Sequence, residues 1–202
     1  KGRLVSPDGK SVPGKALMIC RLHVTALSLY WRFPVEVRDG RFELHGLDPD
    51  KSYPVYFLEP EKQWGTRVEL SGKQAGTEVT VRLQPCGKAT ARFVNLAGKP
   101  AAEHRPSLEI VVTPGALRFD IEASKKGLLV ADGDHVANVD RHNYWNGPSA
   151  GADGRCVMPA LIPGVTYRLM TAAKGQIVLG REFTAEAGKT LDLGEIATGQ
   201  GE

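Results

Sequence analysis

Short stretches in which apolar and polar residues alternate recur along the whole chain, and turn-forming residues separate them. In TEVTVRL, at residues 77–83, Val79, Val81 and Leu83 fall on one face of an extended segment. RFELHGL, at residues 41–47, alternates in the same way, with Phe42 and Leu44 on one face. This period of two predicts strands that are buried on one side and exposed on the other.

Two stretches are apolar without alternation, ALMICRLHV at residues 16–24 and SLEIVV at residues 107–112. They predict central strands that are covered on both sides, or strands of a sandwich with a partner domain over them. No long stretch has the helical period of 3.6. One or two turns of helix are expected only in DHVANVDRHNYW, at residues 134–145.

The turns between these stretches have a recognisable chemistry. PDGK at residues 7–10 combines a proline, whose φ is fixed, with a glycine that is free to take a positive φ. RDGR at residues 38–41 and ADGR at residues 152–155 carry the Asp-Gly pair that is typical of two-residue hairpin turns. Asp and Gly therefore occur here for backbone geometry.

The second half of the chain repeats three segments of the first half in the same order. The repeated pairs are RLVSPDGKSVPG (3–14) with RFVNLAGKPAAE (92–103), DGRFELHGLDPDKSY (39–53) with DGRCVMPALIPGVTY (153–167), and AGTEVTVRLQP (75–85) with AGKTLDLGEIA (187–197). The offset between copies is 89 residues for the first pair, 114 for the second and 112 for the third. An insertion of about 25 residues, within about 113–151, accounts for the increase.

We therefore predict an all-β protein of two tandem β-sandwiches, each with about seven strands in two sheets. The first domain is expected at 1–86. The second, diverged copy with the insertion is expected at 87–202. Tyr53 and Tyr167 close the repeated phrase, and each is expected to place its ring in a core with its hydroxyl hydrogen-bonded near the rim.

The repeated positions resemble the carboxypeptidase regulatory-like domain family. In the first copy the resemblance rests on Gly2, Gly9, Lys10, Pro13, Gly14, Asp39, Gly40, Phe42, Leu44, Leu47 and Tyr53, and in the second on Gly98, Lys99, Pro100, Asp153, Gly154, Leu161, Pro163, Gly164 and Tyr167. The second copy departs from the pattern with Cys156 in place of the aromatic residue and with its insertion. The resemblance implies a transthyretin-like (prealbumin-like) Greek-key sandwich, used as an accessory or interaction module of cell-surface or periplasmic proteins. It implies no chemistry.

Charge and cysteines restrict the possible partners and compartments. The net charge of +3 is spread over the sequence without a basic cluster, which argues against nucleic-acid binding. No apolar run approaches the roughly 20 residues that cross a bilayer. The start at Lys1 and the end in GQGE indicate a segment of a larger protein, and an extracytoplasmic location is expected. The spacing of the three cysteines, Cys20, Cys86 and Cys156, does not match a metal-binding motif. The sequence does not decide whether Cys20 and Cys86 form a disulfide.

Aromatic side chains supply the strongest candidate binding site. Trp64, in EKQWGTR, is expected in a loop and exposed. Exposed aromatic residues near arginine or asparagine stack on sugars or anchor protein partners, and the alternative is interdomain packing. The candidate ligand contacts are Trp64 together with Arg141, Asn143, Tyr144 and Trp145 of the insertion.

The insertion also carries weak candidates for metal binding. Its oxygen donors Asp132, Asp134, Asn138 and Asp140 suit a hard cation such as calcium, but they do not fit the spacing of a calcium loop. His135 and His142 lie seven residues apart, without the spacing of a zinc motif. Helix capping and turn bonding explain the same residues without a metal, and this interpretation is favoured.

No motif for nucleophilic catalysis is present in the sequence, and no cofactor is expected. The favoured function is a non-catalytic interaction or structural module whose partners are an unknown protein or polysaccharide and the other domains of the parent chain. A carbohydrate-binding module using the aromatic residues is one alternative. A metal-dependent hydrolase centred on His135, His142 and Asp140 is the other.

Overall fold

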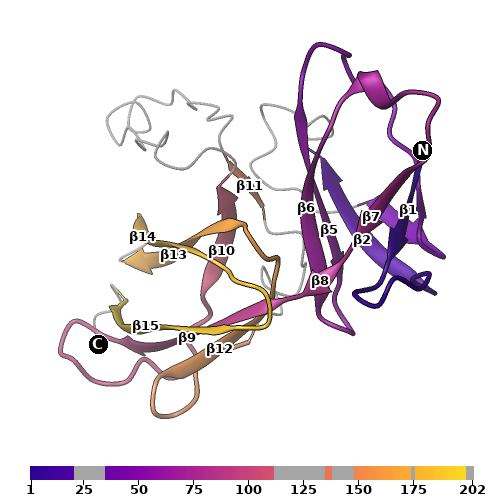
Figure 1. The fold of residues 1–202 in the computed structure, drawn as a ribbon. Coiled ribbons are helices and arrows are strands. Elements are labelled where there is room, and N and C mark those ends of the chain that lie inside the picture. Colours follow the sequence, from indigo (N-terminus) through magenta and orange to yellow (C-terminus); the bar gives the residue numbers. More distant parts are fainter. Residues whose placement is uncertain (21–34, 112–134, 138–147, 174–175, 199–202) are drawn as a thin grey trace.

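A computed structural model describes residues 1–20, 35–111, 135–137, 148–173 and 176–198 (Figure 1). Within these residues the protein is all-β, as the alternating pattern predicts. A single 3-10 turn, η2 (Gly72–Gln74), interrupts the strands. No helix among the described residues has the length and apolar character that crossing a bilayer requires.

The first half of the chain forms one eight-stranded sheet that folds back on itself. Its order is β7-β1-β4-β3-β2-β5-β6-β8. A single residue pair, Arg38 with Arg41, joins β3 to β4 at the fold. The strands are β1 (Gly2–Val5), β2 (Lys15–Cys20), β3 (Val35–Arg38), β4 (Arg41–Phe42), β5 (Tyr53–Glu59), β6 (Trp64–Leu70), β7 (Val79–Arg82) and β8 (Gln84–Pro85).

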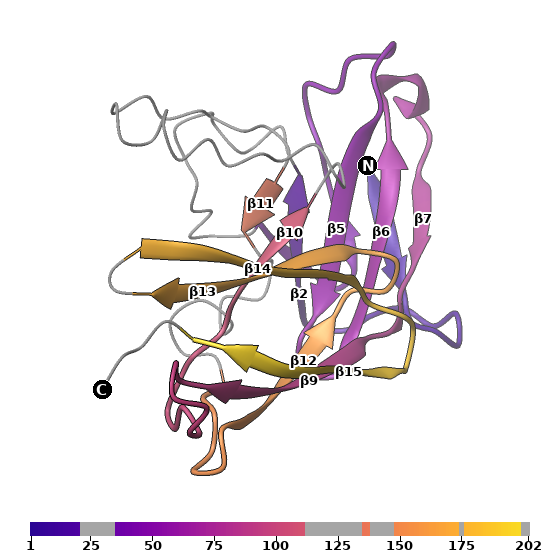
Figure 2. The ribbon, with the colours of Figure 1, turned by 90° about the vertical axis from the view of Figure 1, so that its left-hand side faces the viewer.

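The second half forms two separate sheets. A four-stranded sheet has the order β11-β10-β13-β14, and a three-stranded sheet has the order β12-β9-β15 (Figure 2). The strands are β9 (Gly87–Val94), β10 (Ser107–Val111), β11 (His135–Ala137), β12 (Arg155–Leu161), β13 (Thr166–Ala173), β14 (Gln176–Thr184) and β15 (Thr190–Ala197). The helix expected over residues 134–145 is wrong at 135–137, which pair with β10 as strand β11.

Five strand pairings of the first half recur in the second half. In the first half β1 pairs antiparallel with β4 and parallel with β7, and β2 pairs with β3 and β5. In the second half β9 pairs antiparallel with β12 and parallel with β15, and β10 pairs with β11 and β13. The hairpin β5–β6 corresponds to β13–β14. Strands β1 to β7 thus have the same connectivity as β9 to β15.

The turn after the first strand has the same hydrogen bonds in both halves. The amide of Ser6 donates to the carbonyl of Lys10, and the amide of Gly9 donates to Ser6. The same two bonds join Asn95, Gly98 and Lys99. The Oγ of Ser6 accepts from the Lys10 amide, and the Oδ1 of Asn95 accepts from the Lys99 amide. Short polar side chains at this position stabilise a turn that needs glycine at its fourth residue.

The two Asp-Gly pairs both lie in turns, with different geometry. Asp39 and Gly40 have φ of 49° and 69°, as a two-residue turn between β3 and β4 requires. Asp153 lies one residue before the end of a longer turn, in which the amide of Gly154 donates to the carbonyl of Gly151. The two-residue hairpin predicted at residues 152–155 is therefore wrong in length. Only the first hairpin prediction is confirmed.

Both glycines of these pairs bring the chain against the first strand of their half. The carbonyl of Gly40 accepts from the amide of Leu4 at 2.6 Å, and the carbonyl of Gly154 accepts from the amide of Phe93 at 2.8 Å. A Cβ atom on Gly154 would lie 2.3 Å from the carbonyl oxygen of Phe93. No side chain fits there, so glycine is required by close approach as well as by its φ of 80°.

Two positions keep a left-handed backbone although only the first half has glycine there. Gly14 and Gly46 have φ of 77°, and the residues at the equivalent places, Glu103 and Ala160, have φ of 61° and 57°. The equivalence follows from the repeat offsets of 89 and 114 residues. Backbone geometry has thus been retained where the sequence has changed.

The closing segment aligns differently in the structure than in the sequence. The amide of Leu83 donates to the carbonyl of Val5, and the amide of Thr198 donates to the carbonyl of Val94. These two bonds correspond at an offset of 115 residues, not 112. Strand β15 contains a register shift between Asp192 and Glu195, which the first half lacks. Extra residues in β15, including this bulge, explain why sequence matching gave the wrong offset.

Candidate functional site

Two apolar cores organise the molecule, and strand β5 contributes to both. Val55 and Phe57 point into the core of the first half. Tyr56 and Leu58 belong to the core of the second half, and Leu17 of the neighbouring strand β2 packs against it. Because successive side chains of a strand point to opposite faces, a strand buried on both faces reads as a continuous apolar run. Burial on both faces was predicted for residues 16–24, and Ala16, Met18 and Cys20 lie in the first core while Leu17 packs against the second.

The contact between the halves is close because a glycine lies at its centre. Gly65 of β6 pairs with Leu58. A Cβ atom added to Gly65 would lie 3.0 Å from the Cγ1 of Ile162 and 3.1 Å from the Sγ of Cys86. Ile162 is fully buried and Cys86 is 6% exposed. We call Leu17, Tyr56, Leu58 and Gly65, with Ile162 and Cys86 against them, the docking contact.

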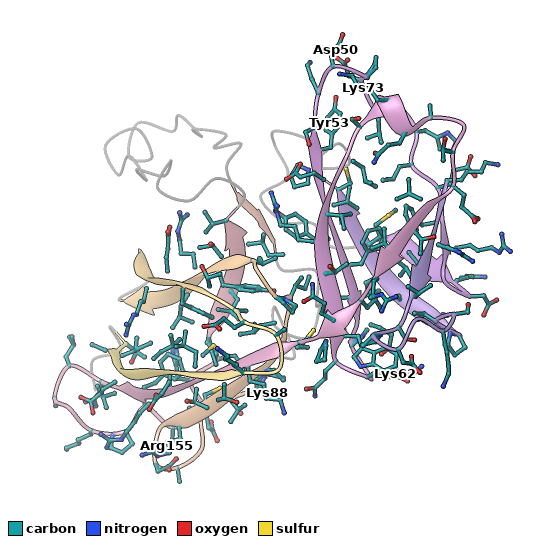
Figure 3. All side chains as sticks on the ribbon, in the orientation of Figure 1. Asp50, Tyr53, Lys62, Lys73, Lys88 and Arg155 are labelled. Atoms are coloured by element: carbon teal, nitrogen blue, oxygen red, sulfur yellow. The ribbon has the colours of Figure 1, made fainter. Side chains whose placement is uncertain are left out.

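A pocket of about 230 Å³ lies at the other end of the first half. We call it the end pocket, and its lining is apolar at the base, with polar groups at the rim. It lies between the end of β4, the end of β6 and the start of β7, near Lys73 in Figure 3. The lining residues are Lys1, Phe42, Leu44, His45, Gly46, Leu47, Leu70, Ser71, Gly72, Gln74, Ala75 and Val79.

The rim of the end pocket carries one exposed charge network. Glu43 Oε1 lies 3.6 Å from Lys1 Nζ and 3.4 Å from His45 Nε2. All three side chains are largely in water, where such pairs contribute little to stability. Lys1, Glu43 and His45 thus form an exposed polar rim, and none of these three charges is buried.

Trp64 is placed differently from the prediction. It is the first residue of β6 rather than a loop residue, and it is half-buried against the core of the first half. The Nζ of Lys62 lies 5.0 Å from the centroid of its ring, within the range of a cation–π contact. Lys62 lies at the end of the first half opposite Lys73 (Figure 3). Packing and Lys62 together leave less of the indole ring available for a sugar than an exposed loop residue would offer.

Except for His135, the other candidate residues lie outside the part of the chain that the structure describes. Arg141, Asn143, Tyr144 and Trp145 lie outside the described residues, as do Asp132, Asp134, Asn138, Asp140 and His142. His135 is in strand β11. No group of three or more His, Cys, Asp or Glu side chains suited to a metal occurs in the part of the chain that the structure describes. The ligand contacts expected in the insertion therefore stay a prediction, and its metal-binding residues stay weak candidates.

The cysteines are packing residues in this structure. Cys20, Cys86 and Cys156 are buried thiols, so the Cys20–Cys86 disulfide left open by the sequence is wrong. Burial raises the pKa of the Cys156 thiol above its usual value. A thiol with a raised pKa and little exposure is a poor nucleophile.

Two buried polar side chains were missed by sequence reasoning. His104 is 6% exposed, stacks at 4.6 Å on the ring of Phe93, and has its pKa lowered by burial. Arg168 is 3% exposed and donates from Nε and Nη2 to Oε1 of Glu182 at 3.1 and 2.7 Å. The sequence contains no sign that either side chain is buried, because burial of a polar group depends on which other segments pack over it.

Tyr167 and Tyr53 confirm their predicted role to different degrees. Tyr167 is fully buried, and its hydroxyl accepts a hydrogen bond from the amide of Ile162 at 2.7 Å. This bond ties the loop before β13 to the strand and fixes Ile162 at the docking contact. Tyr53 is only half-buried, packed at the edge of the first core.

Comparisons with known proteins give a general similarity only. No family model matches the chain, so the carboxypeptidase regulatory-like resemblance stays a prediction. No curated protein matches either. Among solved structures, a streptococcal ancillary pilin is similar at 16% identity and a TM-score of 0.30. The match covers 96% of this chain but 61% of the pilin.

Two further solved structures have the same level of similarity. The shaft pilin SpaA of Lactobacillus rhamnosus GG matches at 11% identity and a TM-score of 0.30, over 100% of this chain and 96% of that chain. A putative cell adhesion protein of Bacteroides fragilis matches at 10% identity and a TM-score of 0.27, over 84% and 70%. At these TM-scores the similarity carries no argument about function.

Proposed function

We propose that this chain is a non-catalytic structural and interaction module of a larger cell-envelope or secreted protein. In this proposal it consists of two tandem β-sandwich domains, 1–86 and 87–202, that are docked into one rigid unit. Other domains of the parent chain and a protein or polysaccharide outside it are the partners.

The docking contact is the observation that carries the proposal. A flexible pair of domains would expose polar faces to each other across a linker. Here Tyr56 is 1% exposed and Leu58 is fully buried, and both belong to the apolar core of the second half. The chain passes from β8 to β9 with Cys86 as the only residue between them. Such a junction leaves no linker to absorb rotation.

Repeated connectivity supports the same function. The residues that recur between the halves occupy turns and cores, such as Gly40 and Gly154 against the first strands. No acid–base pair, nucleophile or metal ligand set recurs with them among the described residues. A repeat that conserves geometry and varies its surface suits a spacer that presents binding surfaces at fixed distances.

Rigidity can be tested with spin labels. Lys73 and Arg155 are exposed and lie in different halves, as Figure 3 shows, while the three native cysteines are buried. Pulsed electron resonance on the K73C/R155C protein should give one narrow distance distribution. A broad or bimodal distance distribution would contradict the proposal that the two domains form one rigid unit.

A variant of the docking contact supplies the matched comparison. Gly65→Val adds atoms where Ile162 and Cys86 already lie within about 3 Å of a Cβ position. We expect this variant to broaden the distance distribution between the labels. Thr77→Val, at an exposed residue outside the docking contact, should leave the distribution narrow. Equal distributions for both variants would contradict the role of the docking contact.

A further inference from the structure

Basic side chains from four strands of the first half meet in one row. Arg3 of β1 pairs with Arg41 of β4. Arg41 pairs also with Arg38 of β3, and Arg38 pairs with Lys15 of β2. Side chains of directly paired residues lie next to each other on one face of a sheet. All four residues are exposed, and we call them the basic row.

The basic row faces solvent because the alternate positions on the same strands face the core. Leu4, Ala16, Val37 and Phe42 are neighbours of the row along the chain, and all are buried in the first core. Pairing separates adjacent strands by about 4.8 Å, so the row is roughly 14 Å long. It crosses the fold between β3 and β4 on the outer side of the sheet, and the surface that it forms is therefore convex.

The second half contains the beginning of the same row, with its charges compensated. Arg92 and Arg155 correspond to the first two members of the basic row at offsets of 89 and 114 residues, and they also pair directly. Glu195 of β15 pairs with Arg92, and its Oε2 lies 2.6 Å from Nη1 of that arginine. Asp153 Oδ2 lies 3.6 Å from Arg155 Nε. Each arginine of the second half therefore has a carboxylate beside it.

The first half lacks this compensation. Strand β7 flanks β1 (Figure 1), and at the place of Glu195 it has Thr80, whose Oγ1 accepts a hydrogen bond from Arg3 Nε at 3.0 Å. Glu78 Oε2 lies 3.9 Å from the same Nε, and both side chains are more than half exposed, so this pair contributes little. Arg41 forms no ion pair with a described residue. Like charges directly opposite each other destabilise a sheet, so the fold gains nothing from the row.

We propose that the basic row binds an anionic polysaccharide that carries a carboxylate on each sugar residue. A guanidinium group donates paired hydrogen bonds to a carboxylate, which makes arginine well suited to this anion. The cations repeat at the strand spacing of about 4.8 Å, and one sugar residue of a polysaccharide has a similar length. Successive carboxylates of the polymer can thus meet successive members of the row.

The surroundings of the basic row favour a polysaccharide over other polyanions. A protein partner needs apolar or aromatic side chains at the centre of its interface. Single-stranded nucleic acid needs aromatic side chains on which its bases stack. The large exposed hydrophobic residues among the described ones all lie in the second half, namely Leu96, Val157 and Leu191. The row therefore offers charge and hydrogen-bond donors without such anchors.

This inference specifies the polysaccharide partner of the proposed function and rests on that function. It agrees with the absence of a basic cluster from the sequence, because the four residues come together only through strand register. Binding is expected at the outer surface of the first sheet, and the two arginines tested below lie on β1 and β4, neither of which contributes to the docking contact.

Removing two charges tests the site. Fluorescently labelled oligogalacturonate is titrated into the protein, and the affinity is measured by anisotropy. The variant with Arg3→Gln and Arg41→Gln should bind at least about tenfold more weakly. The variant with Arg92→Gln and Arg155→Gln removes the same charge from the equivalent pair and should bind as tightly as the original protein. Equal binding by both variants, or no binding by the original protein, overturns the proposal.

A single added carboxylate tests the site with every arginine in place. Thr80→Glu puts a carboxylate opposite Arg3, where the second half has Glu195. Binding should fall at least about threefold, because the new carboxylate competes with the polymer for the arginine. Thr190→Glu adds the same charge at an exposed residue of β15 and should leave binding unchanged. If Thr80→Glu binds as tightly as the original protein, the basic row is not the site.

Other polymers test the class of partner. Affinity for oligogalacturonate should fall between about 0.05 and 0.2 M salt, as for other polyanions. Uncharged dextran should not bind, and poly-L-glutamate and single-stranded DNA should bind more weakly than oligogalacturonate. Binding of dextran, or equal or tighter binding of either other polyanion, overturns the polysaccharide as partner. These failures leave the distance distribution of the spin-labelled protein narrow, whereas a broad distribution with intact oligogalacturonate binding contradicts only the rigid unit.

Discussion

Gly154→Ala should be among the most destabilising alanine substitutions at a turn of this protein. Gly154 has a φ of 80°, and a Cβ atom would lie 2.3 Å from the backbone carbonyl oxygen of Phe93. Backbone atoms cannot rotate away as a flexible side chain can. The turn must therefore separate from β9, and the hydrogen bond from the amide of the fully buried Phe93 to Gly154 is lost.

The magnitude follows from two separate costs. A left-handed backbone costs a residue with a Cβ about 1–2 kcal/mol. A buried amide without its partner costs about 1–3 kcal/mol more. Together they destabilise the protein by roughly 2–5 kcal/mol. Gly98→Ala is the matched control, because Gly98 has a φ of 74° and nothing within 4 Å of its Cβ position. It should cost only about 1–2 kcal/mol.

Urea denaturation followed by far-ultraviolet circular dichroism measures both variants. Gly98 and Gly154 lie in the same half, so both variants report on the same unfolding unit. Gly40→Ala should fall between them, since its Cβ would lie 3.0 Å from the carbonyl oxygen of Leu4 at a φ of 69°. If the three variants have the same free energy of unfolding, close backbone approach does not explain the glycine of either Asp-Gly pair.

Four further substitutions test other parts of the structure. Glu103→Gly should stabilise the protein by about 0.5–1 kcal/mol, because glycine adopts the left-handed backbone of this exposed residue without the strain of a Cβ atom; denaturation showing a loss of stability would contradict this. Tyr167→Phe should cost about 1–3 kcal/mol by leaving the Ile162 amide without its acceptor, while Tyr53→Phe should cost less than about 0.5 kcal/mol. Burial lowers the pKa of His104 in the folded protein, so the stability of the protein should fall as the pH drops below 6.5, the ordinary pKa of histidine. His104→Gln should weaken this pH dependence, and an identical pH profile for both proteins would refute the assignment.

Several features of the fold could be predicted from local sequence. Alternation in residues 77–83 is confirmed, with Val81 and Leu83 buried between exposed neighbours. The Asp39-Gly40 turn is confirmed because two successive positive φ angles are a local demand on residue type. The helix at residues 134–145 fails at 135–137 because backbone hydrogen bonds to β10 outweigh a weak helical period.

The candidate site was predicted less well. Trp64 was expected to lie exposed in a loop. It is instead the first residue of strand β6, and it packs partly buried against the first core. The end pocket left no signal in the sequence, because its lining comes from four separated segments. The signal that could have found it is the comparison of the two repeats. Residues 43–47 and 157–161 are followed by the same turn, but among the described residues only 157–161 are assigned to a strand.

The sequence by itself determined the class of the protein, the Asp39-Gly40 turn and the recurrence of one connectivity. These depend on residues next to each other along the chain, where alternation and glycine act locally. Tertiary structure alone decided that β5 contributes to two cores, that Gly65 admits Ile162, and that an end pocket lies between the ends of β4 and β6 and the start of β7. Each of these depends on which distant segment packs there, and long-range packing is not written in any single stretch of residues.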